Sequence, residues 1–179
     1  DNFFRAAGTL KDDKHTSFTF DESDVYKVIE GASYSLQAKP NPALEKYIDT
    51  LITYIAAAQE KDGYLYTFRT MKNSNPHEWV GAKRWEKEED LSHELYDLGH
   101  LYEAAVAHYR ATGKKSLLNI AIKSADLLVK TFGWGKEEKF PGHQIIETGL
   151  GKLYRVTGKK AYLDLAKFFL WITFEFSRH

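Results

Sequence analysis

Apolar residues recur at helical spacing along most of the chain. The first such stretch follows Ser23 and contains Val25, Val28, Ile29, Ala32 and Leu36. Intervals of three and four place these side chains on one helical face, so they predict a helix with Ser23 as its N-cap. The stretch 42–62 has a similar apolar stripe, with Pro42 in the first turn and Gly63 as a stop. It predicts a second helix.

The remainder of the pattern predicts four more helices and almost no strands. They run over 92–112, 116–132 and 143–157, and from about Ala161 onward. Gly113 and Gly158 follow two of these helices directly, as C-caps commonly do. The predicted fold class is all-α.

Three segments depart from the helical period. Residues 1–22 are polar and predict an extended lead-in, whereas residues 64–91 predict a long aromatic loop, with a short hairpin at "YLYTF". Residues 170–179, "LWITFEFSRH", form an atypical tail. The chain 1–179 is interpreted as one partial domain. Because it opens without an initiator Met or a signal sequence, we expect it to begin inside a longer precursor.

A repeated sequence motif indicates how the helices are organised. "HYRATGKK" and "LYRVTGKK" place Tyr109 and Tyr154 45 positions apart, and each phrase ends one helix and leads into another. The interval therefore measures one helical hairpin, which must stack on a neighbour to bury its apolar side. The helices around "AKPNP" resemble an earlier, diverged copy. Three hairpins predict an arc of a solenoid or of a closed toroid.

Composition excludes several kinds of partner and site. Twenty-five basic residues offset twenty-five acidic ones, so no net charge favours nucleic acid or an anionic membrane. Runs such as "LITYIAAA" are too short to span a bilayer. The sequence has no cysteine, which removes disulfides, thiolate metal sites and a cysteine nucleophile from these residues.

One predicted helix carries unusual polar residues. In "SHELYDLGHLYE", His93, Tyr96, Asp97 and His100 have the spacing of a single helical face. Taken singly, each residue is more simply interpreted as part of a solvated or hydrogen-bonded surface. The phrase also approaches the zinc-protease pattern, but Asp97 stands where that pattern needs a second histidine.

A second group lies in "FPGHQIIE", where His143 opens a predicted helix and Glu147 follows one turn later. The repeat predicts that His93 and His143 approach the same mouth of the arc, although a histidine at a helix start can simply satisfy terminal backbone groups. Trp79 and Trp85 add aromatic rings, which suit the apolar faces of sugars and suit a peptide or a core equally well.

Four blocks of the chain resemble glycoside hydrolase family 127, the β-L-arabinofuranosidase family. These blocks are "SDVYKVIEGASYSL", "LITYIAAAQEKDGYLYT", "SHELYDLGHLYEAAVAHYRATGKKSLLNIAIKSAD" and "FPGHQIIETGLGKLYRVTGKKAYLDLAKFF". The resemblance covers about residues 20–169 in order. It implies about half of an (α/α)6 toroid whose axial pocket takes a terminal L-arabinofuranose, from a bacterial enzyme of carbohydrate metabolism.

The resemblance also implies roles for particular residues. The histidines of "HELY" and "PGH" hold the sugar in that family, which assigns substrate binding to His93 and His143. Further candidates for substrate binding are Glu94, Tyr96, His100, Glu147, Trp79 and Trp85.

The family's catalytic groups are expected to lie outside this chain. They are an acid/base Glu and a zinc site of one Glu and three cysteines, one of which is the nucleophile of a retaining mechanism. They belong to a later part of the barrel, so we expect no catalytic residue, no metal ligand and no activity from this piece alone. A half toroid also predicts self-association through its exposed edge.

Two other functions remain open at this point. A helical-repeat module that binds a protein would share the period. Another (α/α)6 carbohydrate enzyme, such as an unsaturated uronyl hydrolase, would require a catalytic carboxylate among Asp97, Glu94 and Glu147.

Overall fold

The computed structural model describes residues 1–11, 18–71 and 78–176 of the chain, and these ranges contain eight helices. In order they are α1 (Asn2–Ala6), α2 (Glu22–Ala38), α3 (Pro42–Ala58), α4 (Thr67–Thr70), α5 (Glu94–Thr112), α6 (Ser116–Thr131), α7 (Ile146–Thr157) and α8 (Lys160–Phe176). An isolated bridge between Phe132 and Glu137 is the only β pairing in the described part of the chain. The all-α prediction is confirmed.

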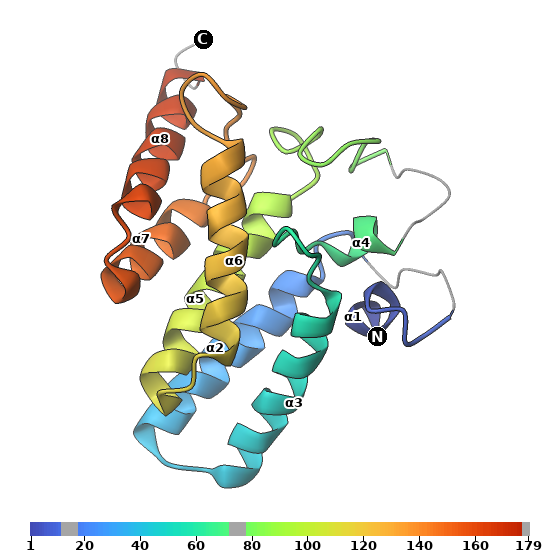
Figure 1. Ribbon diagram of the computed structural model, residues 1–179, viewed down its shortest axis with the longest axis vertical. Helices are drawn as coiled ribbons and strands as arrows, with labels where there is room; N and C mark the ends of the chain where they lie inside the picture. Colours follow the sequence, from blue (N-terminus) through green and yellow to red (C-terminus); the bar gives the residue numbers. More distant parts are fainter. Residues whose placement is uncertain (12–17, 72–77, 177–179) are drawn as a thin grey trace.

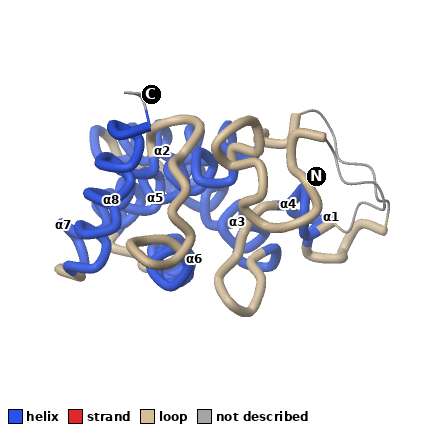
Figure 2. The backbone as a smooth tube through the Cα atoms, turned by 90° about the horizontal axis from the view of Figure 1, so that it is seen from above, coloured by secondary structure: helices blue, strands red, loops and turns tan. Residues whose placement is uncertain are grey.

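The six long helices form two layers of three. Helix α5 packs between α2 and α7 in one layer, which we call the inner layer. Helix α6 packs between α3 and α8 in the other, which we call the outer layer. Figure 1 shows α6 between α3 and α8, and Figure 2 shows the same helices from above. Each hairpin thus contributes one helix to each layer. This arrangement fits an arc of a double-ringed toroid.

The two copies of the repeated motif form the same turn. Gly113 and Gly158 both have φ of 72°, and each donates its backbone N–H to a tyrosine carbonyl at 2.8 Å, that of Tyr109 or Tyr154. Positive φ disfavours residues with a Cβ, which explains the glycine in each copy. The predicted hairpin turns are confirmed.

The first lysine of each "GKK" ties its hairpin to the one before it. Lys114 Nζ lies 2.6 Å from an Asp49 carboxylate oxygen in α3, and Lys159 Nζ lies 3.0 Å from Asp126 in α6. Each contact joins a turn to the outer-layer helix of the preceding hairpin. The repeat therefore fixes the stacking of hairpins as well as the turn inside each.

Helix α5 is the most enclosed element, with buried side chains along most of its length. Gly99 permits α7 to approach closely, because a Cβ there would lie 2.5 Å from Ile145 Cγ2 and 2.8 Å from the Ile146 nitrogen. Gly149 faces the Gly99 carbonyl in the same way. This close crossing places the start of α7 against the first half of α5.

Two loop predictions were wrong. The lead-in contains helix α1, in which Phe3 packs on Tyr26 with ring centroids 6.0 Å apart; a five-residue helix is too short to show a helical period. The "YLYTF" segment is an extended stretch followed by α4, and no hairpin forms. The hydroxyl of Tyr66 instead donates to the Ser92 carbonyl at 2.8 Å.

The helix boundaries also moved at several ends. The helix expected from His143 begins at Ile146, and the helix expected from Ser92 begins at Glu94. The atypical tail continues α8 as far as Phe176, and residues 177–179 lie outside the described part. No helix within the described ranges is long and apolar enough to cross a membrane.

Candidate functional site

His93 stands in the N-cap position of α5 with left-handed backbone angles, φ 62° and ψ 21°. Its ring Nδ1 lies 2.5 Å from the Leu91 carbonyl oxygen, which orients the imidazole. A non-glycine residue in this conformation costs about 1–3 kcal/mol and is typical of functional sites. His93 is therefore held in a specific orientation at a cost in backbone energy.

His143 lies next to His93, in the loop that precedes α7. The Gly142 N–H donates to the Glu88 carbonyl at 3.0 Å, so this loop lies directly on the segment that leads into α5. A Cβ on Gly142 would stand 2.7 Å from that same carbonyl oxygen, which explains the glycine in "PGH". The close contact of the two loops brings His143 to His93.

The imidazoles of His93 and His143 are in contact, with ring centroids 4.6 Å apart. Tyr96 packs edge-on against both, at 5.8 Å from His93 and 5.7 Å from His143. His100 follows at 4.6 Å from Tyr96, on the next turn of α5. We call His93, Tyr96, His100 and His143 the imidazole cluster. His143 is exposed and the other three are half-buried.

The surroundings of His93 and His100 favour the neutral form of both imidazoles. Partial burial lowers the pKa of His93 and of His100, because desolvation disfavours the charged imidazolium. Lys27 in α2 lies over the Tyr96 ring, 5.1 Å from its centroid, and its charge lowers the pKa of His100 further. A neutral imidazole can donate one hydrogen bond and accept another, which suits sugar hydroxyls.

A row of aromatic rings leads away from His93. Phe20 lies 4.7 Å from the His93 ring, Phe18 stacks on Phe20 at 5.4 Å, and Trp79 is parallel to Phe18 at 6.5 Å. Trp79 thus connects to the cluster through two phenylalanines that the sequence pattern did not single out. Both lie in the segment interpreted as a lead-in, which has no period to reveal them.

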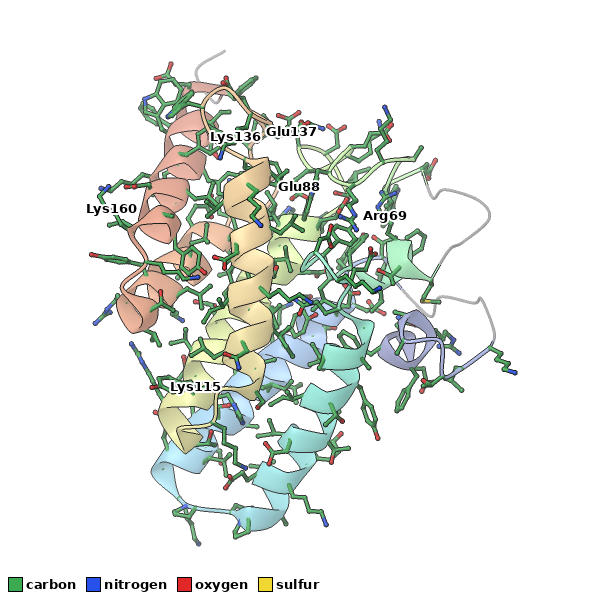
Figure 3. All side chains as sticks on the ribbon, in the orientation of Figure 1. Arg69, Glu88, Lys115, Lys136, Glu137 and Lys160 are labelled. Atoms are coloured by element: carbon green, nitrogen blue, oxygen red, sulfur yellow. The ribbon has the colours of Figure 1, made fainter. Side chains whose placement is uncertain are left out.

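Glu94 is the first residue of α5 and is buried next to His93 in the chain. Its side chain is 1% exposed, and it accepts hydrogen bonds from the Tyr64 hydroxyl at 2.5 Å and the Trp85 backbone N–H at 2.9 Å. Arg69, labelled beside α4 in Figure 3, stands 3.9 Å away. Burial raises the pKa of Glu94 to about 7. The carboxyl therefore joins α4, the long loop and α5.

Trp85 is also enclosed. Its indole is 6% exposed and packs edge-on against Tyr64 at 5.3 Å and Phe132 at 5.4 Å. Its backbone has φ of 64°, the second left-handed non-glycine position among the described residues. The structure places this ring in the core, where it supports the loop that carries His93.

Asp97 does not join the exposed face that helical spacing predicted. It is 1% exposed and lies beside Glu22 of α2, which is 3% exposed, so the two buried carboxyls form a close pair. Among the described residues no donor reaches either Asp97 oxygen, so burial favours the protonated form of this acid. Burial raises the pKa of both acids, and the nearby Glu22 carboxyl raises that of Asp97 further.

Glu88 and Glu147 complete the buried acids near this end of the helices. Glu88, labelled near the start of α5 in Figure 3, accepts from Ser92 Oγ at 3.1 Å and from the Leu95 N–H at 3.2 Å, so it caps the helix. Glu147 accepts from the Ile145 N–H at 3.1 Å, and burial raises its pKa. It is 8% exposed.

The zinc site implied by the family resemblance does not fit the residues present. No group of three or more histidine and acidic side chains in the described ranges is arranged to hold a metal ion. The sequence has no cysteine to serve as a thiolate ligand. Zinc chemistry is therefore not assigned to the residues of this chain.

Comparison with known proteins gives consistent matches. The family described as "Beta-L-arabinofuranosidase, GH127 catalytic domain" matches residues 1–174. A non-reducing end β-L-arabinofuranosidase of Bifidobacterium longum subsp. longum is 41% identical over 167 residues, which is 92% of this chain and 25% of that protein.

Two solved structures are also similar. A GH127 β-arabinofuranosidase superposes with a TM-score of 0.90 at 56% identity, over 94% of this chain and 27% of that one. A GH127 β-L-arabinofuranosidase from Geobacillus stearothermophilus T6 gives 0.85 at 44% identity, over 94% and 25%. The chain thus spans about a quarter of the length of these relatives.

Proposed function

Because the chain belongs to the GH127 family of β-L-arabinofuranosidase catalytic domains, we propose that it supplies one wall of the pocket that holds a terminal L-arabinofuranose. The main support is the contact of His93 with His143, whose ring centroids are 4.6 Å apart although the residues come from different hairpins. Two imidazoles with Tyr96 between them present several hydrogen-bonding atoms to a ligand the size of one sugar ring.

In this proposal the chain binds the sugar and does not cleave it. Retaining glycoside hydrolysis needs a nucleophile and an acid/base group that both reach the glycosidic bond. The two acids in the first turn of α5, Glu94 and Asp97, are each 1% exposed, and Glu94 accepts a hydrogen bond from the Tyr64 hydroxyl. Such buried acids suit a structural role. We therefore assign to His93 and His143 the positioning of the sugar hydroxyl groups.

The experiment is a titration of the purified chain with methyl β-L-arabinofuranoside, followed by calorimetry or ligand-observed NMR. We expect His143→Ala to weaken binding about tenfold, which corresponds to one strong hydrogen bond. Because His143 is exposed, folding should be unaffected. The exposed neighbour Gln144 provides the matched control, Gln144→Ala, which should bind as the wild type does.

Unchanged affinity in His143→Ala would refute the role of that imidazole. Release of arabinose by the purified chain alone would refute the assignment of binding without cleavage.

The outer face of α8 supports a second proposal, self-association. Leu170, Trp171 and Phe174 are between 50% and 58% exposed. Trp134 packs edge-on against Trp171, with ring centroids 4.6 Å apart, and both rings line a groove of about 590 Å³. Contiguous apolar surface of this kind is typical of interfaces. Helices α3 and α6 each pack against the corresponding helix of the next hairpin, so the outer face of α8 is a surface of the same kind, and we propose that a second copy of the purified chain covers it.

Light scattering over a concentration series tests this second proposal. We expect the mean mass to rise with concentration and Trp171→Glu to abolish the rise. Tyr47→Glu changes an equally exposed aromatic residue on α3, which is 59% exposed, and should have no effect. A monomer at all concentrations would refute self-association.

A further inference from the structure

We propose that Lys139 is a positioning residue, which holds His143 against His93 and so sets the affinity of the imidazole cluster for a sugar. This inference rests on the proposed function, because it concerns the same binding site. Lys139 lies in the loop between α6 and α7, four residues before His143. Its side chain is half-buried and does not belong to the cluster itself.

The Lys139 ammonium reaches from one loop to another. Its Nζ donates to the Trp85 carbonyl oxygen at 2.8 Å and to the Glu86 carbonyl oxygen at 3.2 Å. Trp85 and Glu86 belong to the long loop that leads into α5, whereas Lys139 belongs to the loop that leads into α7. The contact therefore joins two hairpins at the end that carries the imidazole cluster.

Trp85 connects this contact to His93. Its backbone N–H donates to the Glu94 carboxyl at 2.9 Å, and Glu94 directly follows His93 at the start of α5. The Trp85 N–H is thus engaged on the His93 side, and the Trp85 carbonyl is engaged on the His143 side. The residue between them has φ of 64°. A non-glycine residue keeps this conformation only where its surroundings fix it.

The two loops are linked at a second point, where the Gly142 N–H donates to the Glu88 carbonyl. This link alone would leave the His143 loop free to rotate about it. A further link at Lys139, three residues earlier, fixes the direction of the loop. The buried Pro141 between the two links stiffens the segment, because its ring fixes φ. Loss of the lysine contact should therefore move His143.

Another lysine of the same loop makes a local contact and provides a matched control. Lys136, labelled above α6 in Figure 3, donates to the Val129 carbonyl at 2.7 Å. Val129 lies in the last turn of α6, the helix from which this loop departs. Both lysines carry the same charge and donate to backbone carbonyls. They differ in that Lys139 contacts the loop that leads to His93.

The experiment compares Lys139→Met with Lys136→Met in titrations of the purified chain with methyl β-L-arabinofuranoside. Methionine keeps an unbranched side chain and removes the ammonium donors. We expect Lys139→Met to weaken binding about fivefold, and Lys136→Met to bind as the wild type does. Lys139→Arg retains a charged donor and should bind within about twofold of the wild type.

A double variant separates positioning of His143 from general support of the fold. If Lys139 acts through His143, then Lys139→Met should cause no further loss of affinity in a His143→Ala background. A general structural effect would instead lower the affinity by the same factor in both backgrounds. Because Lys139 is half-buried, the melting temperature of Lys139→Met should stay near that of the wild type. A strongly lowered melting temperature would overturn the proposal.

The pH titration of the His93 ring by NMR gives a readout that needs no ligand. Burial lowers the pKa of His93, and the charge of the neighbouring His143 lowers it further. We expect Lys139→Met to raise this pKa toward its ordinary value, because the two rings would separate. His143→Ala should also raise it. The double variant should show no further rise, which would exclude a direct effect of the lysine charge.

The possible failures are distinguishable. If the wild type binds the sugar and Lys139→Met binds it equally well, the positioning role is overturned and the proposed pocket stands. A full further loss of affinity in the His143→Ala background would also overturn that role, because Lys139 would then act through the fold. If the wild type bound no sugar, the proposed function would fail, and the role of Lys139 in affinity with it.

Discussion

The two ends of the inner helices use the same backbone conformation for different purposes. At the turn end, Gly113 and Gly158 both have φ of 72°, and glycine adopts this angle without strain. At the site end, His93 and Trp85 have φ of 62° and 64° and carry large side chains in the same left-handed region. At the turn end this conformation reverses the chain without backbone strain. At the site end it costs backbone energy and fixes the orientation of a large side chain.

Buried charge distinguishes the two ends as well. At the turn end, Lys114 and Lys159 pair with acids on a partly exposed surface, where such contacts contribute little. At the site end, Glu22, Glu88 and Asp97 are each at most 3% exposed, and burial raises the pKa of all three. The difference teaches that the turn end keeps its charges at the surface, whereas the site end holds acids out of water at a cost in stability.

The largest expected effect is that of Gly142→Ala. A Cβ would clash with the Glu88 carbonyl at 2.7 Å and separate the loops that hold His93 and His143. We expect a loss of about 2 kcal/mol in unfolding free energy, together with a loss of sugar binding. Chemical denaturation and calorimetry measure both.

Gly151→Ala is the matched control for this change. A Cβ at Gly151 meets nothing within 4 Å, and the position is helical, so we expect a gain of up to about 1 kcal/mol. Equal stability of the two variants would show that the Gly142 contact does not constrain the loops.

The buried acids predict that stability falls as pH rises. In the folded chain Glu22, Asp97 and Glu94 hold their protons to higher pH than in the unfolded chain. The unfolded state therefore releases protons first, and the free energy of unfolding decreases from the ordinary carboxyl pKa up through the raised one. We expect a loss of about 1–2 kcal/mol between about pH 6.5 and pH 8, above the range in which the lowered pKa values of His93 and His100 act in the opposite direction.

Asp97→Asn should make this pH dependence shallower, because asparagine resembles the protonated acid and cannot ionise. Asp24→Asn changes an acid whose side chain is 77% exposed and should leave the slope as it is. Melting curves across the pH range provide the measurement. A slope that Asp97→Asn does not alter would exclude the carboxyl pair as a source of the effect.

A smaller effect is expected at the turn end. Gly113→Ala forces a Cβ into the left-handed region and should cost about 1 kcal/mol. Sugar binding should not change, because the turn lies at the opposite end of α5 from His93. A loss of binding without a loss of stability would contradict the separation of the two ends.

The smallest change in stability is expected for His93→Gly. Relief of left-handed strain, about 1 kcal/mol, should offset the lost ring contacts, so the melting temperature stays near that of the wild type. Affinity for methyl β-L-arabinofuranoside should fall about tenfold or more. A strongly destabilised variant would show that His93 contributes to folding more than to binding.

The contrast between the ends also explains what sequence could predict. The turns were predictable because "YRxTGKK" carries its whole local structure in consecutive residues. The stripes on α3 and α6 report burial directly, whereas Val28 of the stripe predicted on α2 is 61% exposed. The family match over 1–174 then sets aside the helical-repeat module and the unsaturated uronyl hydrolase as interpretations.

The site was predictable only in part. All three histidines of the cluster were identified, but the contact of His93 with His143 depends on Gly142 and the Glu88 carbonyl, which lie in different loops. Spacing placed Asp97 on the face of His93, but His93 is a left-handed N-cap outside the helical period, and Asp97 lies buried beside Glu22. Such pairings join distant segments, so no local period can reveal them.

The central claim is that His93 and His143 contact a terminal L-arabinofuranose. Its most direct test is an NMR titration of the histidine ring resonances with methyl β-L-arabinofuranoside at constant pH. The account predicts saturable shifts of the His93 and His143 rings with one common dissociation constant, while the buried His108 in α5 stays unchanged. Saturable shifts elsewhere with both of these rings unmoved would contradict it.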